Sequence, residues 1–521
     1  MKKFLKQWRW TILIGIVVLV LGTLLRVYNL TLLPVFVDEA IYIRWSQIMV
    51  NEPTLRFLPL SDGKQPLFMW VLMFLVKRFS DPLFIGRLLS VASGVGTMVG
   101  IFTLSYLLFK SKMVSLTSAF IWAISPYSLF FDRMALVDPM LCMFGVATAI
   151  FGLLTVRYKR LDYALLTGLS LGFASLTKSP AVFFAVLLPV GWLIYFPKQS
   201  RLRYVLSACG LLSSTFILAF GMYNIQRLGP NFHLLTSRTE DYVFPISHAW
   251  TNFKDPFVFH IQEVFVDWLV KMGTWPILLA WLFSYLINWK KHSRQLLFLS
   301  AWFLIPTLVQ SELAKVFTAR YELYTLPFLF IMAASIFMQK KVKWQKYVSW
   351  GIFVLFTTTA LFFDWKLLTN PEAANLPNSE RSGYLEEWTA GTGIKEVADY
   401  LKSQVLNLKP DEVIVIGTEG YFGTLPDGLQ MYLDNTTQVI TIGVGLDFKE
   451  LPQSLIESQE SGNDTYLLVN KSRFKGDPDE LGLELVAAYA KALRINEESR
   501  EFRLKGPQEV LFFYKLTNKS I

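Results

Sequence analysis

The strongest constraint on the fold is a series of apolar runs, each long enough to cross a lipid bilayer as a helix. A membrane-spanning helix needs about 20 apolar residues. Only 17% of the 521 residues are charged, well below the roughly 25% of an average soluble protein. The apolar runs predict eleven spans, at 11–29, 87–109, 113–131, 136–156, 162–177, 181–196, 204–225, 272–289, 295–312, 321–338 and 346–364. The sequence therefore predicts a polytopic α-helical membrane protein.

The net charge of +10 is distributed as a topology signal. Clusters of Lys and Arg lie between the apolar runs, at 2–9, 110–112, 157–160, 198–203, 290–294 and 340–346. Short loops rich in Lys and Arg stay in the cytoplasm, so one orientation satisfies every cluster. It places the N-terminus in the cytoplasm and the region after 364 outside. We expect a multi-pass protein of the cell (plasma or inner) membrane with no nucleic-acid partner.

The chain divides where the composition changes, after residue 364. Residues 1–364 form the predicted transmembrane domain. Its first outer loop, 30–86, contains an apolar run at 66–76 that is too short to span and indicates an interfacial helix. Charged residues and short β-type runs follow at 413–416, 438–442, 466–469 and 510–516, with a helical stretch at 394–406. This pattern predicts a soluble extracytoplasmic α/β domain at 365–521, within the usual size of one domain.

Charged residues are missing from the middle of every predicted span and collect at the outer ends instead. Ion-coupled transporters place acids near the bilayer midplane, so this distribution favours an interfacial active site. A carboxylate can deprotonate an acceptor hydroxyl, and Lys or Arg can hold a leaving phosphate. Loop charges that face water or snorkel are the alternative explanation for any one residue. The charges are Asp38, Glu39, Arg44, Lys64, Arg87, Asp132, Arg133, Asp138, Lys178, Lys315, Arg320 and Glu322.

Five short motifs follow one another along this predicted outer face. They read VDEAIY at 37–42, GKQPL at 63–67, RMALVD at 133–138, LTKSP at 176–180 and RYELYTLP at 320–327. In order and topology, over roughly 10–340, they resemble the GT-C glycosyltransferases of the glycosyltransferase 39 type. These are the protein O-mannosyltransferases and the aminoarabinose transferases of lipid A. The resemblance implies a GT-C fold of about 11 transmembrane helices that acts on a polyprenyl-phosphate-linked sugar.

The resemblance also implies roles for individual residues. Asp38 would be the catalytic base that activates the acceptor hydroxyl, with Glu39 in support. The donor phosphate would be bound by Tyr42, Lys64, Arg320 and Tyr324, with Lys178 and Arg87 as further candidates. Asp138 would position acceptor or donor, together with Asp132 and Arg133. Packing and topology explain Arg87, Asp132, Arg133 and Lys178 equally well.

The predicted reaction is transfer of the sugar to an acceptor hydroxyl of a lipid, glycan or protein on the extracytoplasmic face, with inversion at the anomeric carbon. The alternatives are a polyprenyl-lipid flippase or transporter, and a non-catalytic envelope scaffold. Ile41 and Gln65 stand where aminoarabinose transferases have arginine and proline, so the sugar is left open.

No cofactor is implied by this resemblance. Two acids, Asp38 and Asp138, could share one divalent cation (Mg or Mn), as in the oligosaccharyltransferase relatives. The mannosyl and aminoarabinosyl branches do not indicate that need. The two cysteines, Cys142 and Cys209, lie in apolar runs and support neither a disulfide framework nor a thiolate metal site.

Overall fold

A computed structural model describes residues 2–196, 201–338 and 342–517. Contacts divide the chain into two compact units. The first unit comprises Met1–Leu30, Leu55–Val71 and Arg87–Pro377, and the second comprises Thr31–Thr54, Leu72–Gly86 and Asn378–Ile521. The boundary expected at 364 lies within the first unit. Two parts of the first outer loop are grouped with the C-terminal residues.

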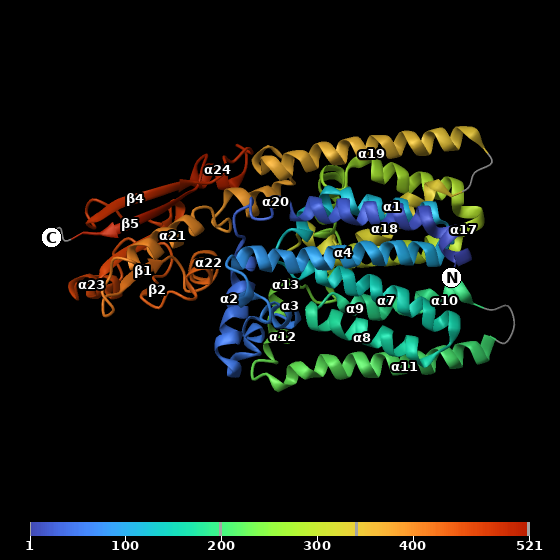
Figure 1. The fold of residues 1–521 in the computed structure, drawn as a ribbon, viewed down its shortest axis with the longest axis horizontal. Helices are drawn as coiled ribbons and strands as arrows, with labels where there is room; N and C mark the ends of the chain where they lie inside the picture. Colours follow the sequence, from blue (N-terminus) through green and yellow to red (C-terminus); the bar gives the residue numbers. More distant parts are fainter. Residues whose placement is uncertain (1, 197–200, 339–341, 518–521) are drawn as a thin grey trace. The chain divides into compact units, whose positions relative to one another are not determined.

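The first unit is a bundle of helices (Figure 1). Within the described ranges, six helices are long and apolar enough to cross a membrane. They are α1 (Lys2–Val27), α4 (Pro82–Phe109), α7 (Asp138–Tyr158), α11 (Arg201–Tyr223), α17 (Trp275–Leu313) and α19 (Lys343–Thr369). A seventh candidate is the pair α5 (Lys112–Ile124) and α6 (Pro126–Asp132), which is bent by 58°. The polytopic helical architecture is confirmed.

The remaining predicted spans also coincide with helix. They correspond to α8 (Leu161–Thr177), to α9 (Ala181–Leu187) with η4 (Leu188–Gly191) and α10 (Trp192–Tyr195), and to α18 (Leu326–Ala334) with η8 (Ser335–Phe337). The two spans predicted at 272–289 and 295–312 lie in α17, whose helical geometry breaks at His292 (φ −127°, ψ 25°). The number of crossings stays a prediction.

Glycines allow neighbouring helices of the bundle to approach closely. A Cβ at Gly100 of α4 would lie 2.7 Å from Val146 of α7. A Cβ at Gly168 of α8 would lie 2.8 Å from the carbonyl oxygen of Thr215 of α11. Small residues at such seams are typical of helix packing in membranes, where close van der Waals contact replaces the hydrophobic effect.

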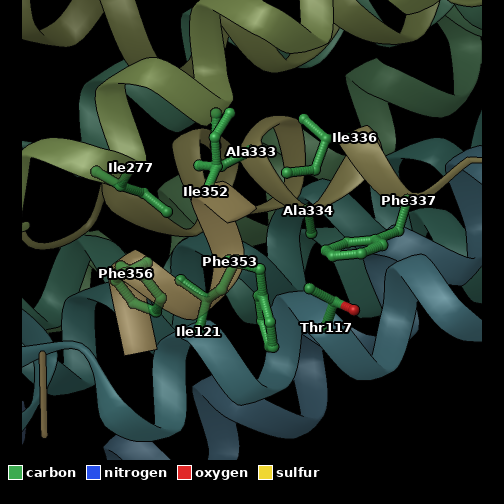
Figure 2. Close-up of a pocket in the computed structure, with 11 residues that line it drawn as sticks. Thr117, Ile121, Ile277, Ala333, Ala334, Ile336, Phe337, Ile352, Phe353 and Phe356 are labelled. Atoms are coloured by element: carbon green, nitrogen blue, oxygen red, sulfur yellow. The ribbon is translucent and has the colours of Figure 1, made fainter. Parts of the chain in front are cut away.

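An apolar crevice marks the junction of α5, α17, α18, η8 and α19. Figure 2 shows Ile121, Ala333, Phe353 and Phe356 among the side chains that line it. Its cavity volume is about 10 Å³, which is at the threshold for a single water molecule. The crevice is therefore a packing feature of the bundle and offers no room for a ligand.

Short helices make up the connections of the first unit. They are η2 (Leu58–Asp62), η5 (Asn224–Leu228), α12 (Leu234–Ser237), α13 (Thr239–Tyr242), α14 (His248–Thr251), α15 (Phe257–Gln262), η6 (Glu263–Trp268), α16 (Leu269–Lys271), η7 (Ala319–Glu322) and η9 (Pro371–Ala373). The interfacial helix expected at 66–76 begins as α3 (Leu67–Leu72).

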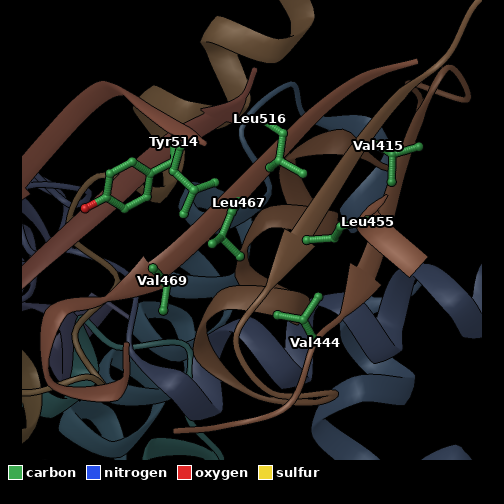
Figure 3. Packing of buried hydrophobic residues seen from close by; sticks show 8 residues of the cluster. Val415, Val444, Leu455, Leu467, Val469, Tyr514 and Leu516 are labelled. Atoms are coloured by element: carbon green, nitrogen blue, oxygen red, sulfur yellow. The ribbon is translucent and has the colours of Figure 1, made fainter. Parts of the chain in front are cut away.

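The second unit contains a five-stranded mixed sheet in the order β2-β1-β3-β5-β4. Its strands are β1 (Ile414–Thr418), β2 (Val439–Gly443), β3 (Asp464–Asn470), β4 (Leu483–Ala490) and β5 (Val510–Leu516). Strand β1 pairs in parallel with β2 and β3, and β5 pairs antiparallel with β3 and β4. Figure 3 shows Val415, Leu455, Leu467 and Leu516 in the hydrophobic core against this sheet. The α/β architecture expected for the C-terminal region is confirmed.

The second unit also contains ten helices among its described residues. They are α2 (Val37–Asn51), η1 (Pro53–Leu55), η3 (Val76–Arg78), α20 (Asn378–Arg381), η10 (Ser382–Glu386), α21 (Ile394–Val405), α22 (Thr424–Leu433), α23 (Gln453–Glu460), η11 (Lys471–Arg473) and α24 (Arg500–Lys505). Four strands and α21 lie where the sequence predicts them, whereas β4 was not predicted. Its sequence LELVAAYA contains three alanines, two leucines and one glutamate, residue types that favour helix.

Candidate active site

An ion pair joins the ends of two consecutive helices of the first unit. Asp138 is the first residue of α7, and Lys178 follows the last residue of α8. The Lys178 Nζ lies 2.6 Å from the Asp138 Oδ1, and the side chains are 20% and 3% exposed. Helix dipoles favour an acid at an N-terminus and a base at a C-terminus, so both charges suit their positions. The Asp138 Oδ2 is buried and has no hydrogen-bond partner among the described residues.

The segment between α17 and α18 adds a second cation to this ion pair. The Lys178 Nζ lies 3.9 Å from the ring centroid of Tyr321, and the guanidinium carbon of Arg320 lies 5.3 Å from the same centroid. One aromatic ring thus contacts two cations, an arrangement stabilised by cation–π attraction. The Tyr127 hydroxyl donates to the carbonyl oxygen of Ala319 at 2.6 Å and fixes the start of the segment.

Buried polar groups hold the rest of that segment in place. Glu322 is fully buried, and its carboxylate accepts hydrogen bonds from Thr307 at 2.7 Å and from Thr325 at 3.0 Å. Tyr324 is 2% exposed and its ring packs edge-on against Phe184. Within the described ranges its hydroxyl has no hydrogen-bond partner. A buried hydroxyl without a partner is uncommon in native structures and is suited to bind a ligand.

The loop that carries Lys64 is held close to Lys178. The Gln65 Nε2 donates to the Ser179 Oγ at 2.7 Å, so the residues next to both lysines are in contact. The Lys64 Nζ lies 3.3 Å from the Asp62 Oδ2, and the lysine side chain is 25% exposed. The first unit therefore brings together Asp138, Lys178 and Arg320, links the Lys64 loop to the Lys178 loop, and also contains Tyr324.

A second polar cluster in this unit serves the ends of helices. Arg26 and Asp132 form an ion pair of 2.8 Å in which both side chains are 0% exposed. The Arg26 guanidinium also donates to the carbonyl oxygens of Trp122 and Ala123 at 3.0 Å, next to the bend between α5 and α6. Broken helices persist in membranes only where such freed carbonyls find donors.

Arg133 and Arg87 satisfy further backbone groups near the end of α1. Arg133 donates to four carbonyl oxygens, at distances of 2.6–3.0 Å, and Arg87 donates to that of Leu30 at 2.9 Å. Arg87 is 0% exposed and Arg133 is 2% exposed. These bonds satisfy part of the hydrogen-bonding capacity of both buried arginines. Their predicted contribution to the site stays a prediction, as does that of Asp132.

The other predicted site residues lie in the second unit, on α2. Asp38 is the second residue of this helix, and Glu39, the third, accepts a hydrogen bond from the backbone N–H of Phe36 at 3.0 Å. Glu39 thereby caps the helix, as an acid in the first turn often does. Asp38 is partly exposed, and Tyr42, one turn later, is 6% exposed. Asp38 is thus placed in a capped first turn.

The structure also identifies residues that sequence reasoning missed. Tyr321 was present in the RYELYTLP motif, but only a fold could show that Lys178 lies on its ring. Arg26 was counted as part of an apolar run, and its ion pair with Asp132 joins residues 106 positions apart. Among the described residues, no group of three or more His, Cys, Asp or Glu side chains could hold a metal ion. Metal dependence stays untested.

The structure is similar to that of ArnT from Cupriavidus metallidurans. The apo state of ArnT matches with a TM-score of 0.56 and 14% sequence identity, over 98% of this chain and 98% of ArnT. ArnT bound to undecaprenyl phosphate matches with a TM-score of 0.57 and 13% identity, over 97% of this chain and 98% of ArnT. No curated protein matches by sequence. The chain has the fold of the GT-C glycosyltransferases.

Part of the sequence matches a particular family within that fold. Residues 63–222 match the model of the dolichyl-phosphate-mannose-protein mannosyltransferase family. This segment contains the Lys64, Asp138 and Lys178 motifs. The resemblance inferred from the five short motifs is therefore confirmed, both as a GT-C fold and as a mannosyltransferase-like sequence.

Proposed function

We propose that this protein transfers a sugar from a polyprenyl-phosphate donor to an acceptor hydroxyl at the extracytoplasmic face of the membrane. The observation that carries the proposal is the cluster in which Lys178 and Arg320 share the ring of Tyr321 beside the buried Asp138. Two cations on one aromatic ring provide charge-assisted donors of the kind that bind a phosphate. A neighbour of the same fold has been solved with undecaprenyl phosphate bound.

The proposed mechanism divides the work among named residues. Asp38 removes the proton from the acceptor hydroxyl, and the resulting nucleophile attacks the anomeric carbon of the donor. The C1–O bond to the phosphate breaks, and the phosphate leaves with its polyprenyl chain and one more negative charge. Lys178, Arg320 and Lys64 stabilise that charge as it develops. Tyr324 and Tyr42 donate hydrogen bonds to the phosphate oxygens.

Attack opposite to the leaving phosphate inverts the anomeric configuration. The partial burial of Lys178 supports its role in holding the leaving phosphate, because a water-poor site strengthens the attraction between the lysine and the phosphate. The ends of α7 and α8 meet at the Asp138–Lys178 pair, so the proposed donor headgroup lies at the membrane interface and its tail lies among the helices.

The decisive experiment is a donor screen with purified full-length protein in lipid nanodiscs. Tritiated undecaprenyl-phosphate monosaccharides are tested one by one, and cleavage of the donor is counted as label transferred to envelope acceptors or to water. We expect one donor to be cleaved. Asp38→Asn should lower the rate by about 10²- to 10⁴-fold, the usual contribution of a general base.

The matched control is Asp162→Asn, at the other end of α8 from Lys178, where the carboxylate is 51% exposed and pairs only with Arg160 among the described residues. Its rate should equal that of the parent. If the parent cleaves none of the donors, the proposed glycosyltransferase activity is refuted. If Asp38→Asn cleaves the donor at the parental rate, the assignment of Asp38 as the base is refuted. A product whose anomeric configuration is retained, as determined by NMR, would refute inversion.

A further inference from the structure

Helix α2, which carries Asp38, is packed against the C-terminal domain, defined here as residues 378–521. Both belong to the second compact unit although the first outer loop and this domain are more than 300 residues apart in the sequence. The contacts occur at the start, the middle and the end of α2. The C-terminal domain thus directly contacts the helix that carries the proposed base.

Backbone hydrogen bonds fix the start of α2. The N–H of Val37 donates to the carbonyl oxygen of Thr389 at 3.1 Å, and the N–H of Gly391 donates to the carbonyl oxygen of Val35 at 2.7 Å. The first N–H groups of a helix have no acceptor within the helix. The C-terminal domain supplies an acceptor for one of them, the N–H of Val37. The chain approaches so closely that a Cβ at Gly391 would lie 2.4 Å from the Val35 Cγ1.

An aromatic pair supports the same seam. The ring of Phe36, the residue that precedes α2, stacks on the ring of Tyr384 with 4.2 Å between the centroids. Phe36 and Ala390 also form an isolated antiparallel bridge. Asp38 lies two residues after Phe36, so these contacts restrain the turn that holds its carboxylate.

The middle of α2 packs against α22 and the loop before it. The ring of Trp45 stacks on Phe422 with 5.7 Å between the centroids. At Gly428 of α22, an added Cβ would lie 3.6 Å from the Cβ of Ala40. The two helices are thus in van der Waals range at this point.

Polar bonds fix the far half of α2. The Arg44 guanidinium lies 2.7 Å from the Asp434 Oδ1, and the two side chains are 18% and 8% exposed. The Gln47 Nε2 donates to the carbonyl oxygen of Met431 at 2.8 Å. Asp434 and Met431 both lie at the C-terminal end of α22. Partly buried charge-assisted bonds of this kind are stronger than those of neutral pairs.

We infer that the C-terminal domain positions the base: its contacts with both ends of α2 fix the direction in which Asp38 presents its carboxylate. This inference rests on the proposed function of Asp38. Arg44, Gln47 and Asp434 are then positioning residues that act through the helix. A catalytic group displaced by about 1 Å can lose on the order of 10² in rate, so this scaffold affects the chemical step more than donor binding.

The test uses full-length protein in nanodiscs with two variants of the scaffold. Asp434→Asn removes the charge that holds Arg44, and Gly391→Ala forces the seam at Val35 apart. Three quantities are measured: kcat for cleavage in the donor panel, the Kd for undecaprenyl phosphate, and hydrogen exchange of the amides at 37–42. The control is Asp464→Asn, which removes the 2.6 Å ion pair with Lys515 in the same domain.

We expect both variants to lower kcat by about 10-fold or more, to keep the Kd within about twofold, and to speed exchange at 37–42. The control should change none of these quantities. The charge reversal Arg44→Asp with Asp434→Arg should recover part of the kcat that either single change loses. Unchanged kcat in both variants, or a lowered kcat with parental exchange at 37–42, would overturn the inference.

The exchange measurement separates this inference from the proposed function. If the parent cleaves no donor, the proposed function fails, yet exchange at 37–42 still reports on the scaffold. Faster exchange in Asp434→Asn and Gly391→Ala would then still show that the C-terminal domain restrains α2. Parental exchange in both variants overturns it.

Discussion

Replacing Gly94 with alanine should break the buried ion pair between Arg26 and Asp132. Gly94 lies on α4, and an added Cβ would stand 2.1 Å from the Asp132 Oδ2 and 2.7 Å from its Oδ1. Such distances require the carboxylate to move. The carboxylate is fully buried and its Oδ2 lies 2.8 Å from the Arg26 Nε, so any movement separates the charges.

The magnitude follows from two opposing contributions. Leaving one member of a buried ion pair without its partner costs about 3–5 kcal/mol. Alanine in place of glycine within a helix returns about 1 kcal/mol. We therefore expect Gly94→Ala to lower the free energy of unfolding by about 2–4 kcal/mol, which is on the order of 10²-fold in the unfolding equilibrium.

The assay is unfolding of the purified full-length protein in detergent, followed by tryptophan fluorescence. Gly210→Ala on α11 is the matched control, because outside the neighbouring helix backbone no heavy atom of the described residues lies within 4 Å of an added Cβ there. It should be neutral or slightly stabilising. Undecaprenyl phosphate should bind both variants with the parental Kd below the unfolding transition. Equal stability of Gly94→Ala and Gly210→Ala would show that the pair does not hold the bundle together.

Two further predictions concern single lysines. Lys178→Met should weaken binding of undecaprenyl phosphate by about 10-fold or more, because it removes a charge-assisted contact, while Lys178→Arg keeps part of the affinity; equal affinity in all three proteins would exclude Lys178 from the phosphate site. Burial lowers the pKa of Lys491 from 10.5 to about 8. Between these values the unfolded chain binds more protons than the folded chain, so stability should rise with pH from about 8 to about 10.5, by at most about 3 kcal/mol. Below pH 8 both states are protonated and this contribution is constant. Hydrogen exchange at the β5 amides, corrected for the intrinsic rate, measures the effect, and Lys491→Met should abolish it; the same rise in that variant would contradict the assignment.

The parts of the fold that the sequence predicts are those set by local patterns. Each long apolar run is helical because a helix satisfies its own backbone hydrogen bonds in lipid. The strands β1, β2, β3 and β5 were predicted because short β-branched and aromatic runs favour a pleated sheet. Strand β4 was missed, since its alanines and glutamate favour helix locally and only pairing with β5 makes it a strand.

The parts that escaped prediction depend on contacts distant in sequence. Val37 and Thr389 hydrogen bond across some 350 residues, and no periodicity of either segment reveals this. For that reason α2 was expected in the transmembrane domain, whereas its contacts place it in the unit of the C-terminal sheet. Lys64, Asp138, Lys178, Arg320 and Tyr324 were chosen from motif order, and all five belong to the first unit.

Burial separates the charged residues at the helix ends into two groups that the sequence could not distinguish. Arg26, Arg87 and Arg133 are at most 2% exposed, and each guanidinium group donates to at least one carbonyl oxygen where helices end or bend. A ligand that bound through these donors would displace backbone hydrogen bonds, so we expect the three arginines to contribute mainly to the fold. Lys178 and Lys64 retain 20% and 25% exposure, and each has its Nζ within 3.3 Å of a carboxylate oxygen. A phosphate can replace a carboxylate at a lysine without breaking the hydrogen bonds to backbone carbonyls at a helix end. Substitutions in the first group should therefore lower stability, and those in the second should lower donor affinity.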